Sequence, residues 1–557
     1  MTMVEDALPS IDNAPIANGL EPVIDMQVAK ETSAPKASPF DAEFEKTTLQ
    51  TLKEWHIPGM SIAVIDGKDT WTQGYGYATL PDIPVKPSTL YYTGSTTKSF
   101  LAAAAAMLVH DNEKYSHVQW DTPMNELVRD DFVLEDEYAT SHVTLEDALS
   151  HRTGMPGHTL TFGGNTLKES VRSLRHLYLN KPIRTTWQYC NLMYMAVSHM
   201  VEVVTGSWLG DFFKEKIWAP LGMTSTFFRL DDAERYVQHH QDNALATGYS
   251  WDKGSGISKP VAHWRDMPVA GAGAIISNVI DYAKYVRSMI EQSGPLPSQA
   301  YADLVSPRTI MPPFDPHFSH TMLYSLGWMI GVYHGHTIIT HGGGLDGFSS
   351  AMMYLPDKKF GIVVLANGQS RGTEDPAWYL IDNLLQVPQE KRINMLEWNG
   401  SAQAEAQKQI ESAPARLYPL APSPGLPLTF PLADYTGVYT HPAYRPLVVS
   451  VTKDTPVPRL RAVAEGGVKV VLNLRHVTAD HFVGDLVLFT HGVEPLAAIK
   501  AGFKLDIQGK VSEFGAELEF LSGGGKMIWF KRQPYSEDAT LLPSATLASQ
   551  GSENHGS

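Results

Sequence analysis

The sequence contains one cysteine in 557 residues, Cys190, so it can form no disulfide within the chain and no metal site built from several cysteines. It also has no excess of positive charge, because 44 lysines and arginines stand against 60 aspartates and glutamates, for a formal net charge of −16. Nucleic acids and anionic membrane surfaces are bound by lysine and arginine. We therefore expect neither as a partner.

Long apolar runs are also missing. No stretch of about 20 apolar residues occurs, which argues against a membrane-spanning helix. The first residues, MTMVEDALPSIDNAPIANG, include early acids and do not resemble a signal peptide. These two absences lead us to expect a cytoplasmic protein. Residues 1–37 and 536–557 are rich in small and polar residues and predict a disordered leader and tail.

What the sequence does contain is enough apolar material, 43% of residues, for a sizeable core. Residues 95–110 have helical propensity and are apolar almost all round, which predicts a buried helix. Apolar spacing and turn residues indicate further elements. Helices are predicted over 41–56, 191–205, 208–218 and 376–387, and β-hairpins over 60–78, 325–343 and 348–367.

The C-terminal part of the sequence differs in composition and in its pattern of apolar residues. Residues 391–430 are rich in proline and alanine and predict a linker. Residues 431–535 then alternate short strand signals with turns, which predicts a small antiparallel β-barrel. The catalytic domain is expected over 38–390.

One candidate for chemistry is the S-x-x-K motif formed by Ser95 and Lys98. Residues three apart on a helix share a face, so the lysine amine can reach the serine hydroxyl. Unpaired N–H groups at a helix start favour a developing oxyanion, and burial there would lower the lysine pKa. The motif also fits an ordinary helix start, so by itself it is weak.

Two further elements gain meaning only beside the first. Tyr189 and Asn191 precede a predicted helix, where a phenol can move a proton and an amide can orient an acyl group. His341 begins a His-Gly-Gly-Gly run, residues 341–344, at the end of a predicted strand. Glycines let a strand edge approach a ligand closely.

The order and spacing of these three elements resemble those of the serine β-lactamase and penicillin-binding protein superfamily. The resemblance is to the branch with class C β-lactamases, esterases and D-aminopeptidases, and it extends through IPGMSIAVIDGK, VTLEDALSHRTGMP, APLGMTSTFF and HGGGLDGFSS. It implies an α+β domain, an antiparallel sheet flanked by helices plus a helical subdomain, followed by a barrel. The strands LADYTGVYTHPAYRPLVVSV and FGAELEFLSGGGKMIWFKR resemble a lipocalin-like barrel.

The resemblance also implies roles for individual residues. Ser95 would be the nucleophile, Lys98 its proton acceptor, and Tyr189 would share the base role and protonate the leaving group. The N–H groups of Ser95 and Gly344 would form the oxyanion hole. Substrate contacts would come from Asn191, His341, Gly342 and Gly343.

The third motif departs from the family pattern. It is His-Gly-Gly where true β-lactamases commonly have Lys-Thr-Gly, which removes a fixed cation for a substrate carboxylate. A neutral small-molecule ester, lactone or amide is therefore the expected substrate, with no cofactor and no metal. The resemblance also allows a homo-oligomer.

Several alternatives stay open. The same residues would serve an acyltransferase of secondary metabolism, and some relatives have lost catalysis and act as scaffolds. A G-x-S-x-G motif over 368–372 suggests the nucleophile elbow of an α/β-hydrolase, but we expect no helix to begin directly after its Ser370, as that elbow requires. His334 and His336 form an H-x-H pair, which we assign to a hairpin turn and not to a metal site.

Overall fold

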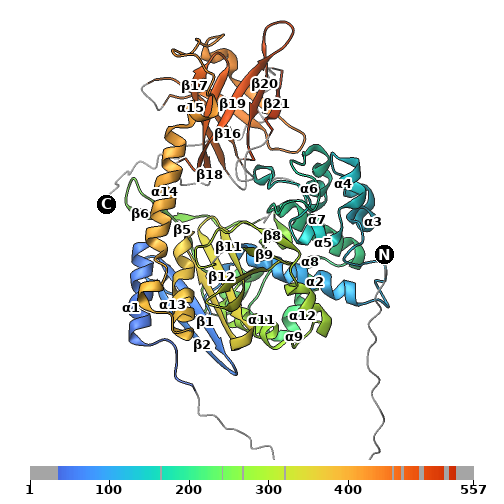
Figure 1. Cartoon of the computed structure of the whole chain (residues 1–557), viewed down its shortest axis with the longest axis vertical. Coiled ribbons are helices and arrows are strands. Elements are labelled where there is room, and N and C mark those ends of the chain that lie inside the picture. The colour runs from blue at the N-terminus through green and yellow to red at the C-terminus, as the bar shows by residue number, and fades with distance from the viewer. Residues whose placement is uncertain are drawn as a thin grey trace, which may run out of the picture. The chain divides into compact units, whose positions relative to one another are not determined.

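An antiparallel sheet of nine strands lies at the centre of the N-terminal two thirds of the chain, in the order β3-β2-β1-β13-β12-β11-β10-β9-β8 (Figure 1). Its strands are β1 Gly59–Asp66, β2 Asp69–Thr79, β3 Ile83–Pro84, β8 Thr309–Met311, β9 Met322–Tyr324, β10 Met329–Tyr333, β11 His336–Leu345, β12 Phe348–Leu355 and β13 Phe360–Ala366. The three predicted hairpins, β1–β2, β10–β11 and β12–β13, are confirmed. Strand β1 pairs with β13 far along the chain, and this pairing joins the early and late hairpins.

The computed structural model describes residues 36–162, 166–240, 242–265, 269–318, 321–453, 457–465, 469–488, 495–519 and 526–534. The predicted tail and all but two residues of the predicted leader lie outside these ranges. Within them, no helix has the length and apolar character needed to cross a bilayer.

Helices cover both faces of the sheet. Successive side chains of a strand point to opposite faces, so Ile62 and Val64 pack with Phe44 of α1 (Ala42–Glu54) while Ala63 and Ile65 join the core on the other side. α1 contacts α13 (Asp375–Leu384), although the two helices are far apart in sequence (Figure 1). α11 (Val279–Glu291) packs on β1 and β13.

The predicted buried helix is α2 (Thr97–His110), and nearly all of its side chains are inaccessible. It packs against α7 (Asn191–Thr205) and α12 (Ser298–Val305). A run of alanines in α2 lets these neighbouring helices approach closely. α2 therefore packs within the core and carries Lys98 on its first turn. The remaining elements are short: α3 Met124–Val128, α4 Glu137–His142, α5 Leu145–Leu149, α6 Leu167–Ser173, α8 Leu209–Phe213, α9 Ala219–Leu221, α10 Leu230–His239, β4 Tyr91–Tyr92, β5 Gly248–Asp252, β6 Ile257–Val261 and β7 Ile276–Ser277.

The segment predicted as a linker, 391–430, contains two helices, α14 (Met395–Glu411) and α15 (Ala413–Leu417). The side chain of Asn394 caps the first turn of α14, and its sequence is rich in Ala, Gln, Glu and Lys, which favour helix. The proline and alanine content of the whole segment had concealed this pattern.

Eight strands close the predicted C-terminal barrel, in sequence order from β14 to β21. They are β14 Gly437–Thr440, β15 Leu447–Val451, β16 Leu460–Ala464, β17 Val470–Thr478, β18 His481–Leu488, β19 Ala497–Leu505, β20 Val511–Ala516 and β21 Ile528–Arg532. In β16, Leu460, Ala462 and Ala464 alternate inward. A charged Arg461 and the short length of β16 made this strand hard to recognise from the sequence. The α+β fold class and the barrel are both confirmed.

Candidate active site

Ser95 lies in a single 3₁₀ turn, Gly94–Thr96, that leads directly into α2. Gly94 has a φ of +54°, and a Cβ atom there would lie 2.9 Å from the Gly344 backbone nitrogen. Only glycine combines this left-handed conformation with such a close approach. The turn therefore presents Ser95 directly beside the glycine run of β11.

Lys98 is completely buried one helical turn after Ser95. Its Nζ lies 3.1 Å from Ser95 Oγ, 2.6 Å from Asn191 Oδ1 and 2.8 Å from the Ala272 carbonyl oxygen. Burial lowers the pKa of Lys98 well below its usual value. The contact between Lys98 and Ser95 expected from their spacing is present, and two further oxygen atoms fix the amine.

Tyr189 lies just before α7 and donates a hydrogen bond from its phenol to Ser95 Oγ, at 2.8 Å. A tyrosine near an ammonium group can ionise, but here burial raises the pKa of Tyr189 above its usual value. The phenol therefore keeps its proton and acts as a donor. Ser95 Oγ is thus contacted by Lys98 and Tyr189, the two polar residues expected beside it.

The glycine run of β11 lies directly against the Ser95 turn. A Cβ atom on Gly343 would lie 2.1 Å from the Thr93 carbonyl oxygen and 3.0 Å from the Ser95 backbone nitrogen. A Cβ atom on Gly344 would meet nothing nearer than 3.8 Å. The two neighbouring glycines therefore differ: position 343 excludes any side chain, whereas position 344 has room for one.

This difference gives a matched pair of variants. Gly343→Ala should move β11 away from Ser95, destabilise the fold by about 1–3 kcal/mol through overpacking, and sharply reduce turnover. Gly344→Ala should unfold at nearly the wild-type temperature. Thermal unfolding followed by circular dichroism measures both, and equal melting temperatures for the two variants would contradict the close approach.

His341 is buried on β11, and its side chain is turned toward the protein. Its Nδ1 lies 2.7 Å from the Gly342 carbonyl oxygen, and its Nε2 lies 3.1 Å from the hydroxyl of Tyr324. Burial and the nearby Lys98 lower the pKa of His341 to about 3. His341 is therefore neutral at physiological pH and supplies no cation for a substrate.

A cavity of about 360 Å³ opens at Ser95. Of the residues singled out in the sequence, it is lined by Ser95, Tyr189 and the run 341–344, whereas Asn191 contacts Lys98 instead. The other lining residues are Phe314, Asp315, Phe318, Met329, Thr340, Ser349, Ser350, Ser370, Arg371, Thr373 and Glu374.

The sequence reasoning missed several of the site's groups. Tyr324 and the Ala272 carbonyl carry no motif, and Glu374 follows an ordinary turn. Burial and the nearby Asp315 raise the pKa of Glu374, which favours its neutral form. Only Ser370 had a signal, the G-x-S-x-G motif.

The reason given for rejecting that motif was wrong. A 3₁₀ helix, Arg371–Glu374, begins directly after Ser370. The assignment to a nucleophile elbow fails for another reason, because the preceding strand β13 pairs antiparallel with both of its neighbours. Ser370 Oγ accepts the Gly372 N–H at 3.1 Å and caps this turn. His334 and His336 form the β10–β11 turn, as expected, and His336 contacts Asp357.

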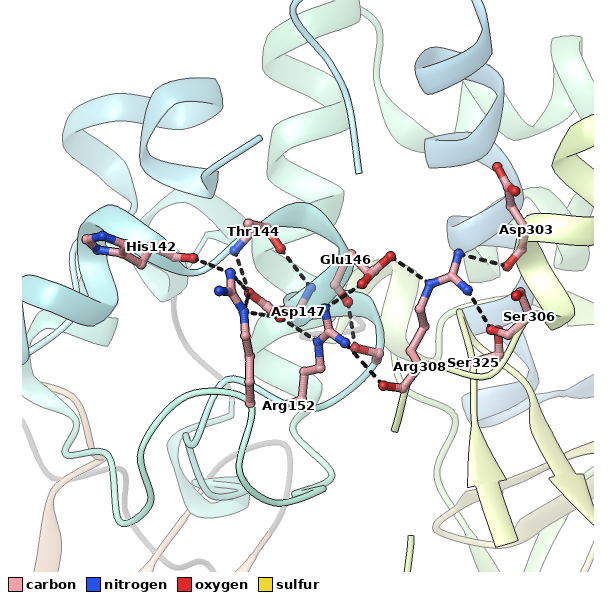
Figure 2. A network of polar contacts seen from close by, with 11 residues as sticks. His142, Thr144, Glu146, Asp147, Arg152, Asp303, Ser306, Arg308 and Ser325 are labelled. Atoms are coloured by element: carbon pink, nitrogen blue, oxygen red, sulfur yellow. Dashed lines mark hydrogen bonds and ion pairs between the residues drawn. The ribbon is translucent and has the colours of Figure 1, made fainter. Parts of the chain in front are cut away.

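A buried ion-pair network supports the segment that carries Tyr189 (Figure 2). Asp147 in the first turn of α5 is fully buried and accepts hydrogen bonds from Arg152 and Arg184. The Arg184 backbone N–H also donates to the Arg152 carbonyl, at 2.6 Å. Arg308 joins through Glu146, at 2.7 Å. The network therefore connects α5, the loop after it and the chain that leads to Tyr189.

Asp147→Asn should destabilise the protein by about 3 kcal/mol, because it removes the fully buried carboxylate that binds both arginines. Arg152 keeps its ion pair with Glu146, whereas Arg184 loses the carboxylate that it binds. Burial alone would raise the pKa of Asp147, but the bonds from Arg184 and Thr144 and the charge of Arg152 outweigh it and lower that pKa. The stabilisation is present above the unfolded carboxyl pKa of about 3.9 and is lost as pH falls through the folded value.

Urea unfolding of wild type and variant between pH 7 and pH 3 measures this effect. The difference between the two proteins should shrink toward acid pH. Glu135→Gln, at an exposed position of the same region, serves as the control and should change stability by less than about 0.5 kcal/mol. An Asp147→Asn variant as stable as wild type at pH 7 would contradict the network's role.

Comparison with known proteins follows the division seen in the fold. Residues 44–386 match the family described as Beta-lactamase, and residues 421–532 match a family described as a domain of unknown function (DUF3471). The unguisins hydrolase ungD' of Aspergillus campestris is 40% identical over 516 residues, covering 89% of this chain and 92% of that protein. The unguisins hydrolase ungD of Aspergillus violaceofuscus is 38% identical, covering 91% and 93%.

Solved structures agree with the fold. The octameric penicillin-binding protein homologue from Pyrococcus abyssi has a TM-score of 0.55 at 21% identity, covering 88% of this chain and 99% of that one. The D-amino acid amidase from Ochrobactrum anthropi has a TM-score of 0.51 at 21% identity, covering 62% and 99%. Fold, site and relatives together define a serine hydrolase of the β-lactamase-related type. The chain belongs to the β-lactamase family.

Proposed function

We propose that the protein hydrolyses a neutral amide or ester through an acyl-enzyme formed on Ser95. The observation that carries this proposal is the convergence of Lys98 Nζ and the Tyr189 phenol on one hydroxyl oxygen. A weak nucleophile needs a base within hydrogen-bond reach, and Lys98 is at that distance with a lowered pKa.

The hydrogen bonds around Lys98 fit a neutral amine. Such an amine has two N–H hydrogens and one lone pair. On this proposal the hydrogens go to Asn191 Oδ1 and the Ala272 carbonyl oxygen, which leaves the lone pair facing Ser95 Oγ at 3.1 Å. A protonated Lys98 would instead donate its third N–H to that oxygen. Tyr189 donates to the same hydroxyl oxygen. On this proposal Asn191 orients the lysine and does not contact the acyl group.

The reaction then balances as follows. Ser95 Oγ bonds to the substrate carbonyl carbon while its proton passes to Lys98. The N–H groups of Ser95 and Gly344 face the developing oxyanion. The bond to the leaving amine or alkoxide breaks, and this group departs with that proton, passed on through Lys98 and Tyr189. In a second step water adds to the acyl carbon and gives a proton to Lys98. The acyl–Oγ bond then breaks as this proton returns to Ser95, which releases the carboxylic acid.

The part of the cavity formed by β11 favours a neutral group beside the reacting carbonyl, and the charged lining residues Arg371 and Asp315 belong to other segments. His341 is neutral, burial favours the neutral form of Glu374, and Phe314, Phe318 and Met329 supply apolar surface. The relatives named as unguisins hydrolases support hydrolysis, and the named D-amino acid amidase shares the fold. An amide is therefore the first substrate class to test. A cytoplasmic location and a homo-oligomer, both drawn from the sequence, remain predictions.

The test is intact-protein mass after exposure to a p-nitrophenyl ester and, separately, to a fluorophosphonate. An ester adduct that forms and decays in water supports a hydrolase. An adduct released only by added alcohol or amine would point to acyl transfer. A folded protein without any adduct would overturn the proposal and favour a binding or scaffolding role.

A further inference from the structure

His151, which the proposed mechanism does not use, occupies a costly position behind Tyr189. It follows α5, is completely buried, and has a φ of +58°. That left-handed conformation is unfavourable for a residue with a side chain. Its Nε2 is also buried without a hydrogen-bond partner among the described residues. A buried polar atom without a partner lowers the stability of a protein.

Two contacts of His151, one from its backbone and one from its ring, bind the chain around Tyr189. The His151 carbonyl oxygen accepts the Gln188 N–H at 2.8 Å, and its Nδ1 accepts the Cys190 N–H at 3.1 Å. These are the two residues on either side of Tyr189. One residue thus fixes the backbone before and after the catalytic phenol.

The second contact also determines the state of the ring. Because Nδ1 accepts an N–H, the ring proton must be on Nε2, and the imidazole is neutral. Burial lowers the pKa of His151 well below its usual value, which agrees with this state. The ring therefore acts as a hydrogen-bond acceptor and a packing surface, and not as a base.

Packing adds a restraint on the phenol itself. The ring centroids of His151 and Tyr189 are 4.4 Å apart, and Tyr324 lies 4.8 Å from His151 on another side. The ion pairs of Figure 2 fix the next residue, Arg152, through Asp147. The loop that carries His151 is therefore anchored independently of Tyr189.

We propose that His151 is a positioning residue that holds the Tyr189 phenol on Ser95 by binding the backbone amides on both sides of that tyrosine. This inference rests on the proposed function, because it assigns Tyr189 a part in the reaction. His151 itself touches neither the Ser95 hydroxyl nor the cavity among the described contacts. Its effect on turnover must then pass through Tyr189.

Two substitutions distinguish the effect of losing the hydrogen-bond acceptor of His151 from the effect of losing its ring. In His151→Asn, the amide oxygen takes the place of Nδ1 and can accept the Cys190 N–H. In His151→Gln, the amide is one methylene further out and that acceptor is lost. With a p-nitrophenyl ester, His151→Asn should stay within about 3-fold of wild-type kcat. His151→Gln should lose about 10- to 100-fold in kcat with little change in KM, as misplaced catalytic groups do.

A double-mutant cycle with Tyr189→Phe gives the decisive readout. If His151 acts through the phenol, adding His151→Gln to Tyr189→Phe should change kcat by less than about 2-fold. Multiplicative losses would show a general structural role and overturn the proposal. A folded His151→Asn variant whose kcat falls 100-fold would also overturn the proposal. This second variant keeps the proposal testable if His151→Gln does not fold.

Fluorophosphonate labelling of the wild type keeps the two hypotheses apart. Labelling at Ser95 together with multiplicative losses would overturn only the role of His151. Folded wild-type protein that is not labelled would overturn the proposed function and, with it, this inference. Melting temperatures of all variants confirm that folded proteins are compared.

Discussion

Ser95→Ala should abolish covalent labelling by both reagents and lower kcat by a factor on the order of 10⁶, as removal of the nucleophile does in other serine hydrolases. The expected loss is large because two polar groups converge on this hydroxyl oxygen. Lys98 Nζ lies at 3.1 Å and the Tyr189 phenol at 2.8 Å. Without Oγ, neither group has a reacting atom on which to act. Intact mass and ester hydrolysis measure the two effects.

Ser370→Ala is the matched control for this experiment. Ser370 lines the same cavity and lies in the sequence motif that competes with Ser95 for the nucleophile. Its hydroxyl caps a 3₁₀ turn, and within the described part of the chain no lysine or histidine is hydrogen-bonded to it. The Ser370→Ala protein should therefore still form the full adduct. An adduct that persists in Ser95→Ala but is lost in Ser370→Ala would reverse the assignment of the nucleophile.

Lys98→Ala should lower kcat by about 10³-fold or more, because it removes the base of a nucleophile–base pair. Lys98→Arg should not restore activity, since a guanidinium stays protonated and has no lone pair for the serine proton. Near-normal turnover in either variant would show that another group takes the proton. Circular dichroism must show that each variant is folded, because Lys98 is completely buried and donates hydrogen bonds to two buried oxygen atoms, Asn191 Oδ1 and the Ala272 carbonyl oxygen.

The pH dependence follows from the same assignment. Burial lowers the pKa of Lys98, so the amine becomes available as a base at lower pH than a free lysine would. As pH falls below the pKa of Lys98, protonation should lower kcat/KM about tenfold per pH unit. His341 cannot cause this loss above about pH 4, because its pKa is lowered to about 3. A His341→Gln variant that keeps the acid limb would exclude His341. Burial raises the pKa of Glu374 to about 8, so a Glu374→Gln variant that also keeps the limb would exclude this cavity carboxyl and leave Lys98 as its source.

Much of the architecture could be predicted because it depends on local patterns. The hairpins β1–β2, β10–β11 and β12–β13 each combine β-rich runs with a short turn, and α7 begins and ends as the spacing indicated. The helix α14 was missed because prolines elsewhere in the segment concealed its favourable residues. Strand β16 gives a weak signal because it has only five residues and the second of them, Arg461, is charged.

The sequence by itself determined the contact between Ser95 and Lys98, because residues three apart at a helix start share a face. The order of the other motifs then indicated the family, and with it Tyr189 and the glycine run. Only the tertiary structure decided what surrounds them. The Ala272 carbonyl that binds Lys98 and the imidazole that brackets Tyr189 come from other elements.

The tertiary structure also decided the protonation states. A lysine, a tyrosine and a histidine have the same residue identities in any fold, but their pKa values depend on how much water the packed chain leaves around them. Burial at the junction of α2, α7 and β11 lowers the pKa of Lys98, raises that of Tyr189 and keeps His341 neutral. The chemistry of the site thus depends on packing between elements far apart in sequence, which no local pattern records.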